Sequence, residues 1–115
     1  MGRIASAIVI LLTATGCVTE RPEPAGGDLR ALLAGRSVLF ENGAAQSFAA
    51  DGTTVYEHGA AQIGRWKIEG GRYCALWTPA DRWLCYRVQP AGSGFDLVFT
   101  AEDGHKTAAR YSDAP

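Results

Sequence analysis

Residues 64–88 read GRWKIEGGRYCALWTPADRWLCYRV, and this stretch decides the fold. Apolar and polar residues alternate along it, and the turn-forming pairs Gly70-Gly71 and Pro79-Ala80 interrupt the alternation. A period of two is typical of β-strands that bury one face, and a short turn joins antiparallel neighbours. The sequence therefore predicts two consecutive β-hairpins in this stretch.

The second hairpin sets the distance between two cysteines. A turn centred between Pro79 and Ala80 places Cys74 directly opposite Cys85 on the neighbouring strand. Opposed cysteines on paired strands are close enough to bridge, and a ring of this size adds about 3 kcal/mol in the loop-entropy model. The alternative is a metal or redox site. It is disfavoured because the chain has no Cys-Xaa-Xaa-Cys and because His58 and His105 both fall in turns.

The same turn geometry predicts a core face. The Gly70-Gly71 turn pairs Ile68 with Tyr73, and a turn at 90–94 pairs Val88 with Phe95. These registers agree on one aromatic and aliphatic face. Its members are Trp66, Ile68, Tyr73, Ala75, Trp77, Leu84, Tyr86, Val88, Phe95, Leu97 and Phe99.

The opposite face is charged except around the cysteines. It carries Trp83 and Leu76 beside the predicted disulfide, together with Arg65, Arg72 and Arg87. One interpretation is local shielding of the disulfide, with an arginine stacked on the Trp83 ring. The other is a binding patch for a protein partner, because exposed Trp and Arg are typical anchors of interfaces.

Turn signals recur about every ten residues from Ser37 to the end of the chain, as in antiparallel sandwiches and barrels. We expect an all-β fold, a small antiparallel eight-stranded meander closing into a lipocalin-like barrel with a largely filled interior. A short helix should precede it, with Asp28 as N-cap and Gly35 as the stop. The expected strands lie near residues 37–41, 46–50, 53–57, 61–69, 72–78, 82–90, 95–101 and 106–112.

The first residues indicate export. Arg3 precedes a ten-residue apolar run, which is followed by Ala14-Thr15-Gly16-Cys17. This pattern resembles a bacterial lipoprotein signal. The resemblance implies a signal peptide over 1–16, a lipid on Cys17, a flexible Pro- and Gly-containing tether over 17–27 and a single domain over 28–115. The alternative is an ordinary secretory cleavage site with a free thiol.

The charge composition of the chain limits the kinds of partner that it is expected to bind. Without Arg3, ten basic residues face twelve acidic ones, so the exported chain has a net charge of −2 and no basic stripe for nucleic acid. Val18 follows Cys17 where an Asp would retain enterobacterial lipoproteins at the inner membrane, which favours the outer membrane by analogy. We expect an envelope location facing the periplasm, with the membrane contacted through the lipid on Cys17.

No catalytic constellation stands out, and no metal or cofactor is expected. Ser93 lies in Gly92-Ser93-Gly94 but between two expected strands, whereas a nucleophile elbow needs a strand followed by a helix. The aspartates fall in turns, where Asp is favoured for backbone reasons. We therefore do not expect an enzyme.

One pattern runs from a Gly after the short helix, through Phe and Asp-Gly, to Gly-Xaa-Trp and a pair of Cys. Here it consists of Gly35, Phe48, Asp51, Gly52, Gly64, Trp66, Cys74, Cys85, Tyr86, Asp103 and Gly104. In this pattern the expected domain, over about residues 29–112, resembles a set of small exported alphaproteobacterial proteins of unknown function. A looser similarity is to lipocalin-like bacterial protease inhibitors, which insert a free N-terminal segment into a protease. No inhibitory residue carries over, because the N-terminus here is expected to be lipidated.

Three function classes remain open. The first, which the sequence favours, is a protein-binding or inhibitory module that acts on another envelope protein. The second is a structural envelope lipoprotein, and the third is a carrier of a small apolar ligand inside the barrel. A cavity in the barrel would favour the carrier, whereas a filled barrel with an exposed apolar patch would favour the partner module.

Overall fold

The computed structural model describes residues 26–92 and 94–113. The predicted signal peptide, Cys17 and residues 17–25 of the tether lie outside the described residues. The short helix α1 (Gly26–Leu33) begins two residues before the expected N-cap Asp28, so Gly26 and Gly27 belong to the helix and not to the tether. The helix ends at Leu33, and Gly35 is the expected stop two residues later, with a φ of 73° that is readily adopted only by glycine.

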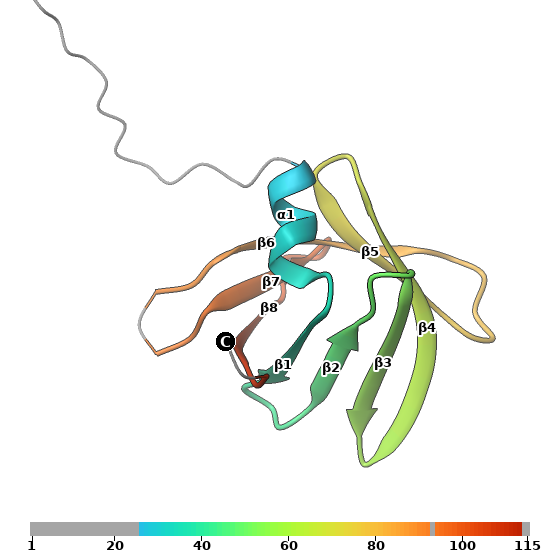
Figure 1. The fold of residues 1–115 in the computed structure, drawn as a ribbon, viewed down its shortest axis with the longest axis horizontal. Coiled ribbons are helices and arrows are strands. Elements are labelled where there is room, and N and C mark those ends of the chain that lie inside the picture. The colour runs from blue at the N-terminus through green and yellow to red at the C-terminus, as the bar shows by residue number, and fades with distance from the viewer. Residues whose placement is uncertain (1–25, 93, 114–115) are drawn as a thin grey trace, which may run out of the picture.

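A closed antiparallel barrel follows α1, with each strand paired to its neighbours in chain order and the last strand paired to the first (Figure 1). This confirms the all-β, eight-stranded meander. Closure matters because it leaves no unpaired strand edge. The strands are β1 (Arg36–Phe40), β2 (Ala45–Phe48), β3 (Thr53–His58), β4 (Ala60–Glu69), β5 (Arg72–Trp77), β6 (Leu84–Pro90), β7 (Leu97–Ala101) and β8 (Lys106–Tyr111).

The registers of the β4–β5 and β5–β6 hairpins are confirmed. Ile68 faces Tyr73 across β4 and β5, and Cys74 faces Cys85 across β5 and β6. Because side chains alternate between the two faces of a strand, these pairings send Trp66 and Tyr73 inward. Both side chains are buried.

The predicted register of β6 and β7 is wrong by four residues. Val88 faces Phe99, not Phe95, because the connection runs from Ala91 to Asp96 and is longer than the expected turn. Asp96 fixes the start of β7: its backbone N–H donates to the Ala109 carbonyl, and its carboxylate accepts from the Tyr111 N–H, both at 2.9 Å. A shift by an even number keeps Leu97 and Phe99 inside.

Two residues of the predicted core face are not core residues. Phe95 lies in the β6–β7 connection, where the Arg110 guanidinium sits 4.8 Å from its ring centroid. Leu84 remains 40% exposed because it is the first residue of β6, where the chain enters the barrel from the projecting β5–β6 connection (Figure 1).

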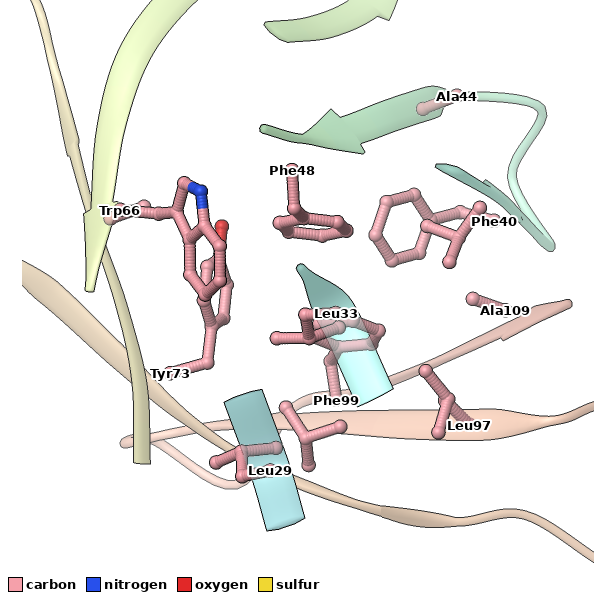
Figure 2. Close-up of a cluster of buried hydrophobic side chains, with 13 residues drawn as sticks. Leu29, Leu33, Phe40, Ala44, Phe48, Trp66, Tyr73, Leu97, Phe99 and Ala109 are labelled. Carbon is pink, nitrogen blue, oxygen red and sulfur yellow. The ribbon is translucent and has the colours of Figure 1, made fainter. Parts of the chain in front are cut away.

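The interior at one end of the barrel is packed under α1. Leu29 and Leu33 of the helix are fully buried, and they point into a cluster in which Phe48 is central (Figure 2). The rings of Trp66 and Tyr73 meet that of Phe48 edge to face, at 5.7 and 5.4 Å between centroids. The short helix therefore acts as a plug held by apolar burial and not by its own propensity.

Polar contacts fix the plug in place. The Trp66 indole N–H donates to the Ala49 carbonyl at 2.8 Å, and the Arg30 guanidinium lies 5.0 Å from the Trp66 ring centroid while donating to the Ala50 carbonyl. On the other side, the Tyr111 hydroxyl donates to the Leu32 carbonyl at 2.9 Å. Helix, β4 and β8 are thus tied together at this end. Among the described residues, no helix is long and apolar enough to cross a membrane.

Candidate functional site: a cup at the open end of the barrel

The end of the barrel opposite α1 is not filled. A cavity of about 230 Å³, called the cup below, opens to solvent there. The sequence predicted a largely filled interior, so this is a correction for one half of the barrel. The lining side chains are Phe40, Asn42, Gln46, Tyr56, Gln62, Tyr73, Trp77, Tyr86, Phe99 and Thr107.

One glycine makes room for the largest wall residue. Gly64 on β4 lies opposite Trp77 on β5. A Cβ at position 64 would come within 2.5 Å of the Leu76 carbonyl oxygen and 2.7 Å of Trp77 Cε3. Only glycine therefore allows the Trp77 ring to lie flat against β4 and line the cup.

The aromatic wall is continuous around the cup. The ring of Tyr56 packs on Phe40 at 6.3 Å and on Trp77 at 6.0 Å between centroids. Tyr73 and Tyr86 are stacked at 5.6 Å. Ring pairs in these arrangements are individually favourable, so the wall is defined without a ligand.

A buried polar group lies at the floor. The Gln46 side chain is only 5% exposed, and its amide nitrogen donates to Thr54 Oγ1 and to the Tyr73 hydroxyl, both at 2.8 Å. Thr54 in turn donates from its hydroxyl to the Ser47 carbonyl at 2.7 Å. Buried polar side chains are costly unless they are hydrogen-bonded, so this network fixes the positions of Gln46 and Tyr73.

Burial raises the pKa of two phenols of the cup, those of Tyr73 and Tyr86. Loss of solvent raises the pKa of Tyr73 far above its ordinary value, and a hydrogen bond from Gln46 only partly offsets this effect. Burial also raises the pKa of Tyr86. Both hydroxyls are therefore hydrogen-bond donors throughout the physiological range. All ten lining residues are uncharged types at neutral pH.

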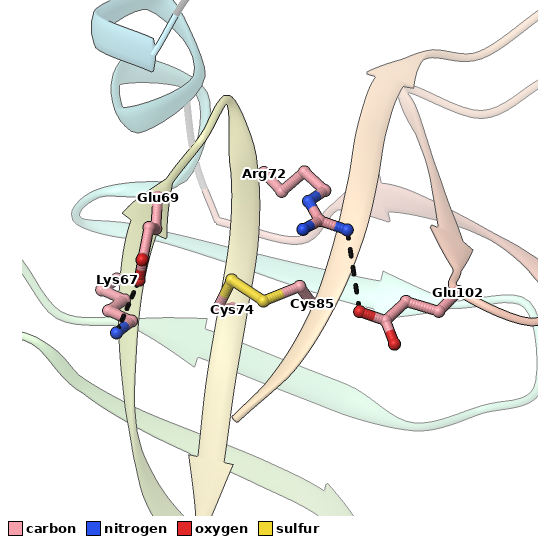
Figure 3. The surroundings of a disulfide bond; sticks show 6 residues. All are labelled: Lys67, Glu69, Arg72, Cys74, Cys85 and Glu102. Atoms are coloured by element: carbon pink, nitrogen blue, oxygen red, sulfur yellow. Dashed lines mark ion pairs between the residues drawn. A yellow bond between two sulfur atoms is a disulfide. The ribbon is translucent and has the colours of Figure 1, made fainter. Parts of the chain in front are cut away.

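The cysteines form the expected disulfide. Their Sγ atoms are bonded at 2.03 Å between β5 and β6, on the outer face of the barrel (Figure 3). Ion pairs flank the bond on both sides: Lys67 with Glu69 at 2.7 Å, and Arg72 with Glu102 at 3.6 Å. The disulfide braces the hairpin that carries Trp77 and Tyr86 into the cup wall.

The outer-face residues are only partly brought together. Arg65 lies opposite Leu76, while Trp83 precedes β6 and Arg87 lies opposite Thr100 of β7. Arg72 is engaged with the Glu102 carboxylate, as described above. An arginine was expected over the Trp83 ring, whereas the cation found there is Lys67, with Nζ at 4.1 Å from the ring centroid. This contact leaves Trp83 half-buried.

Sequence reasoning placed four of the ten lining residues on the core face and missed the other six, among them the polar residues Gln46, Gln62 and Thr107. Each of these three polar residues lies outside the 64–88 stretch. A single polar residue on a strand does not show by itself whether its side chain faces the barrel interior or the solvent. The signal that existed was the phase of β2, because Gln46 is two residues before Phe48 and must share its inward face.

Within residues 26–92 and 94–113, no group of three or more His, Cys, Asp or Glu side chains is placed to hold a metal ion. A scan of protein-family models and searches of curated proteins and of solved structures found no significant match to this chain.

Proposed function

We propose that this chain is a lipid-anchored protein of the cell envelope whose β-barrel binds a small, uncharged, largely apolar molecule. The observation that carries the proposal is the cup, a wall of six aromatic side chains around about 230 Å³ at the open end of a barrel that α1 closes at the other end. An engineered apolar cavity of about 150 Å³ binds benzene, so the cup has the volume for a molecule of one or two rings. This role is non-catalytic and needs no cofactor.

Because of the cup, the carrier replaces the protein-binding module as the favoured function class. The sequence favoured a protein-binding or inhibitory module, on the expectation of a filled barrel. An open aromatic cup supports the carrier instead, because protein pockets for small molecules are concave and mostly apolar with a few placed polar groups.

Filling the cup tests the carrier role. Thr107 and Thr100 lie on facing strands, but Thr107 faces Phe99 and lines the cup, whereas Thr100 is one residue out of phase and points outward. Neutral one- and two-ring fragments are screened against the protein by saturation-transfer NMR. Thr107→Phe should abolish the hits while Thr100→Phe retains them. Hits that persist in Thr107→Phe would place binding elsewhere and refute the carrier role.

A protein-binding role through the outer face is the second candidate. What favours it is that Trp83 is only half-buried on the outer face, although Lys67 Nζ lies 4.1 Å from its ring centroid. Chemical crosslinking in intact envelopes should then join the protein to one partner, and Trp83→Ala should remove the crosslink without changing the fold. A structural lipoprotein would give neither fragment hits nor a crosslink.

The anchoring proposal has its own test. Cys17 is expected to carry the lipid and to hold the domain at the periplasmic side of the membrane, with the outer membrane favoured. Labelled palmitate should enter the wild-type protein and not Cys17→Ser, and the variant should move from the membrane fraction to the soluble periplasmic fraction. Equal labelling of both proteins would refute lipidation at Cys17.

A further inference from the structure

The orientation of the Gln46 carboxamide follows from its neighbours. The Thr54 hydroxyl uses its proton on the Ser47 carbonyl, so toward Gln46 it can only accept. The amide nitrogen must therefore face Thr54, and its second proton is directed at the Tyr73 oxygen.

Two hydrogen-bonding groups are left over at the floor of the cup. Among the described residues, neither the Gln46 carbonyl oxygen nor the Tyr73 hydroxyl proton has a protein partner. Both side chains line the cup and both are more than nine-tenths buried, at 5% and 3% exposed. Native proteins pair nearly all such groups, so a buried acceptor next to a buried donor is a feature that needs an explanation.

The two groups are complementary to an amide. A carboxamide or lactam presents an N–H and a C=O side by side. Its N–H would donate to the Gln46 oxygen, and its C=O would accept from the Tyr73 hydroxyl. A carboxylate has no N–H for Gln46 and would bring a charge into a cup lined by uncharged side chains, at a large desolvation cost.

The aromatic wall of the cup determines which kind of group can accompany the amide in the ligand. Tyr56, Trp77 and Tyr86 present ring faces and edges around the space above the floor. Flat rings fill such a space better than bulky aliphatic groups do, because they stack on or meet the wall rings edge to face. The available volume of about 230 Å³ limits the ligand to one or two rings.

We infer that the cup recognises a planar, uncharged ring compound that carries a carboxamide or lactam group, through the Gln46 carbonyl and the Tyr73 hydroxyl. This inference rests on the proposed carrier function and specifies its ligand class. Gln46 supplies the acceptor, Tyr73 the donor, and Thr54 holds Gln46 in the required orientation.

A set of near-isosteric probes tests the inference on the unaltered protein. Benzamide offers both N–H and C=O, acetophenone offers only C=O, and benzoate carries a charge. Dissociation constants are measured by NMR titration of the mature protein as recovered from cells, in lipid nanodiscs. The two-ring pair 2-quinolone and naphthalene is measured in the same way. Benzamide should bind about tenfold more tightly than acetophenone, and 2-quinolone should bind about tenfold more tightly than naphthalene. In each pair, the tighter ligand makes a buried hydrogen bond that the other ligand cannot make.

A matched pair of variants assigns the effect to Tyr73. Tyr73→Phe removes the donor of the cup, whereas Tyr111→Phe removes a hydroxyl that binds the Leu32 carbonyl at the helix end. The preference for 2-quinolone over naphthalene should fall several-fold in Tyr73→Phe and stay unchanged in Tyr111→Phe. If Tyr73→Phe does not fold, the probe series on the wild-type protein decides alone.

The outcomes separate the inference from the function on which it rests. Equal affinities for benzamide and acetophenone, and for the two-ring pair, would overturn the amide inference while the carrier function stood. Equal affinities for benzamide and benzoate would overturn the exclusion of charged ligands as well. No binding of any probe at millimolar concentration would overturn both.

Discussion

Trp77 lies directly opposite Gly64 on the neighbouring strand, with its ring where any Cβ at position 64 would have to sit. The absence of a side chain at position 64 is what allows the Trp77 ring to form part of the cup wall. The Leu76 carbonyl, 2.5 Å from that hypothetical Cβ, is part of the strand and has no freedom to move aside. A single methyl group therefore has to displace either the ring or the β4–β5 pairing.

The first prediction is that Gly64→Ala lowers the free energy of unfolding by about 1–3 kcal/mol, the usual effect of overpacking. Gly92→Ala is the matched control, because a Cβ there meets nothing within 4 Å and the backbone needs no positive φ. Urea unfolding followed by tryptophan fluorescence measures both variants. Equal stability of the two variants would show that Trp77 is not held against Gly64.

A second prediction concerns the disulfide. The double substitution Cys74→Ala with Cys85→Ala should lower the free energy of unfolding by about 3 kcal/mol, since the bond restricts the unfolded chain and its removal also strips packing from the buried Cys74. Reduction of the wild-type protein should cause a somewhat smaller loss, because the reduced Cys74 side chain keeps its packing. Urea unfolding with and without reductant checks this. A midpoint unaffected by reductant would mean that the bond adds no stability.

The hairpins around Cys74 and Cys85 were predictable from sequence for a definite reason. Short turns admit few registers, and a register that is wrong by one residue would have placed Trp66 and Tyr73 in solvent. Pattern and turn chemistry therefore selected the same pairing. The burial of both residues confirms it.

The β6–β7 register escaped prediction because its determinant is distant in sequence. A six-residue connection permits several even-numbered registers that all keep Leu97 and Phe99 inside. Asp96 selects one of them through hydrogen bonds to Ala109 and Tyr111 of β8. No local pattern encodes a contact of that kind.

The cup was missed for another reason. Alternation assigns a residue to the inside of a barrel but not to a depth along its axis. Depth decides that Phe48 packs under α1 whereas Gln46, two residues earlier and equally inward, lies at the floor of a cavity. Depth depends on how the strands are staggered around the closed barrel, which involves all eight pairings together.

The third prediction addresses the helical plug. Leu33→Ala should lower the free energy of unfolding by about 2–5 kcal/mol, because Leu33 is fully buried among the aromatic rings and its truncation leaves a cavity. Leu39→Ala is the matched control, since Leu39 is 42% exposed on β1. Thermal and urea unfolding should show a small change for the control. A small change for Leu33→Ala as well would mean that α1 does not close the barrel.

The last prediction is a loss of stability at alkaline pH. Burial raises the pKa of Tyr73, Tyr86 and Tyr111 in the folded protein, whereas in the unfolded chain each ionises near its ordinary value of about 10. Above pH 10 the unfolded state therefore binds fewer protons than the folded state, and the free energy of unfolding falls as pH rises. Below about pH 8 all three phenols are neutral in both states, so their contribution is constant.

The substitution Tyr86→Phe measures how much of the alkaline loss of stability comes from Tyr86. Its hydroxyl has no hydrogen-bond partner among the described residues, so the substitution should change stability little at pH 8. At pH 11 the variant should lose less stability than the wild type, because it has one ionisable phenol fewer in the unfolded state. Rapid urea unfolding at the two pH values measures the difference. Parallel losses in both proteins would show that Tyr86 ionises equally well in the folded barrel, and that this part of the cup is open to water.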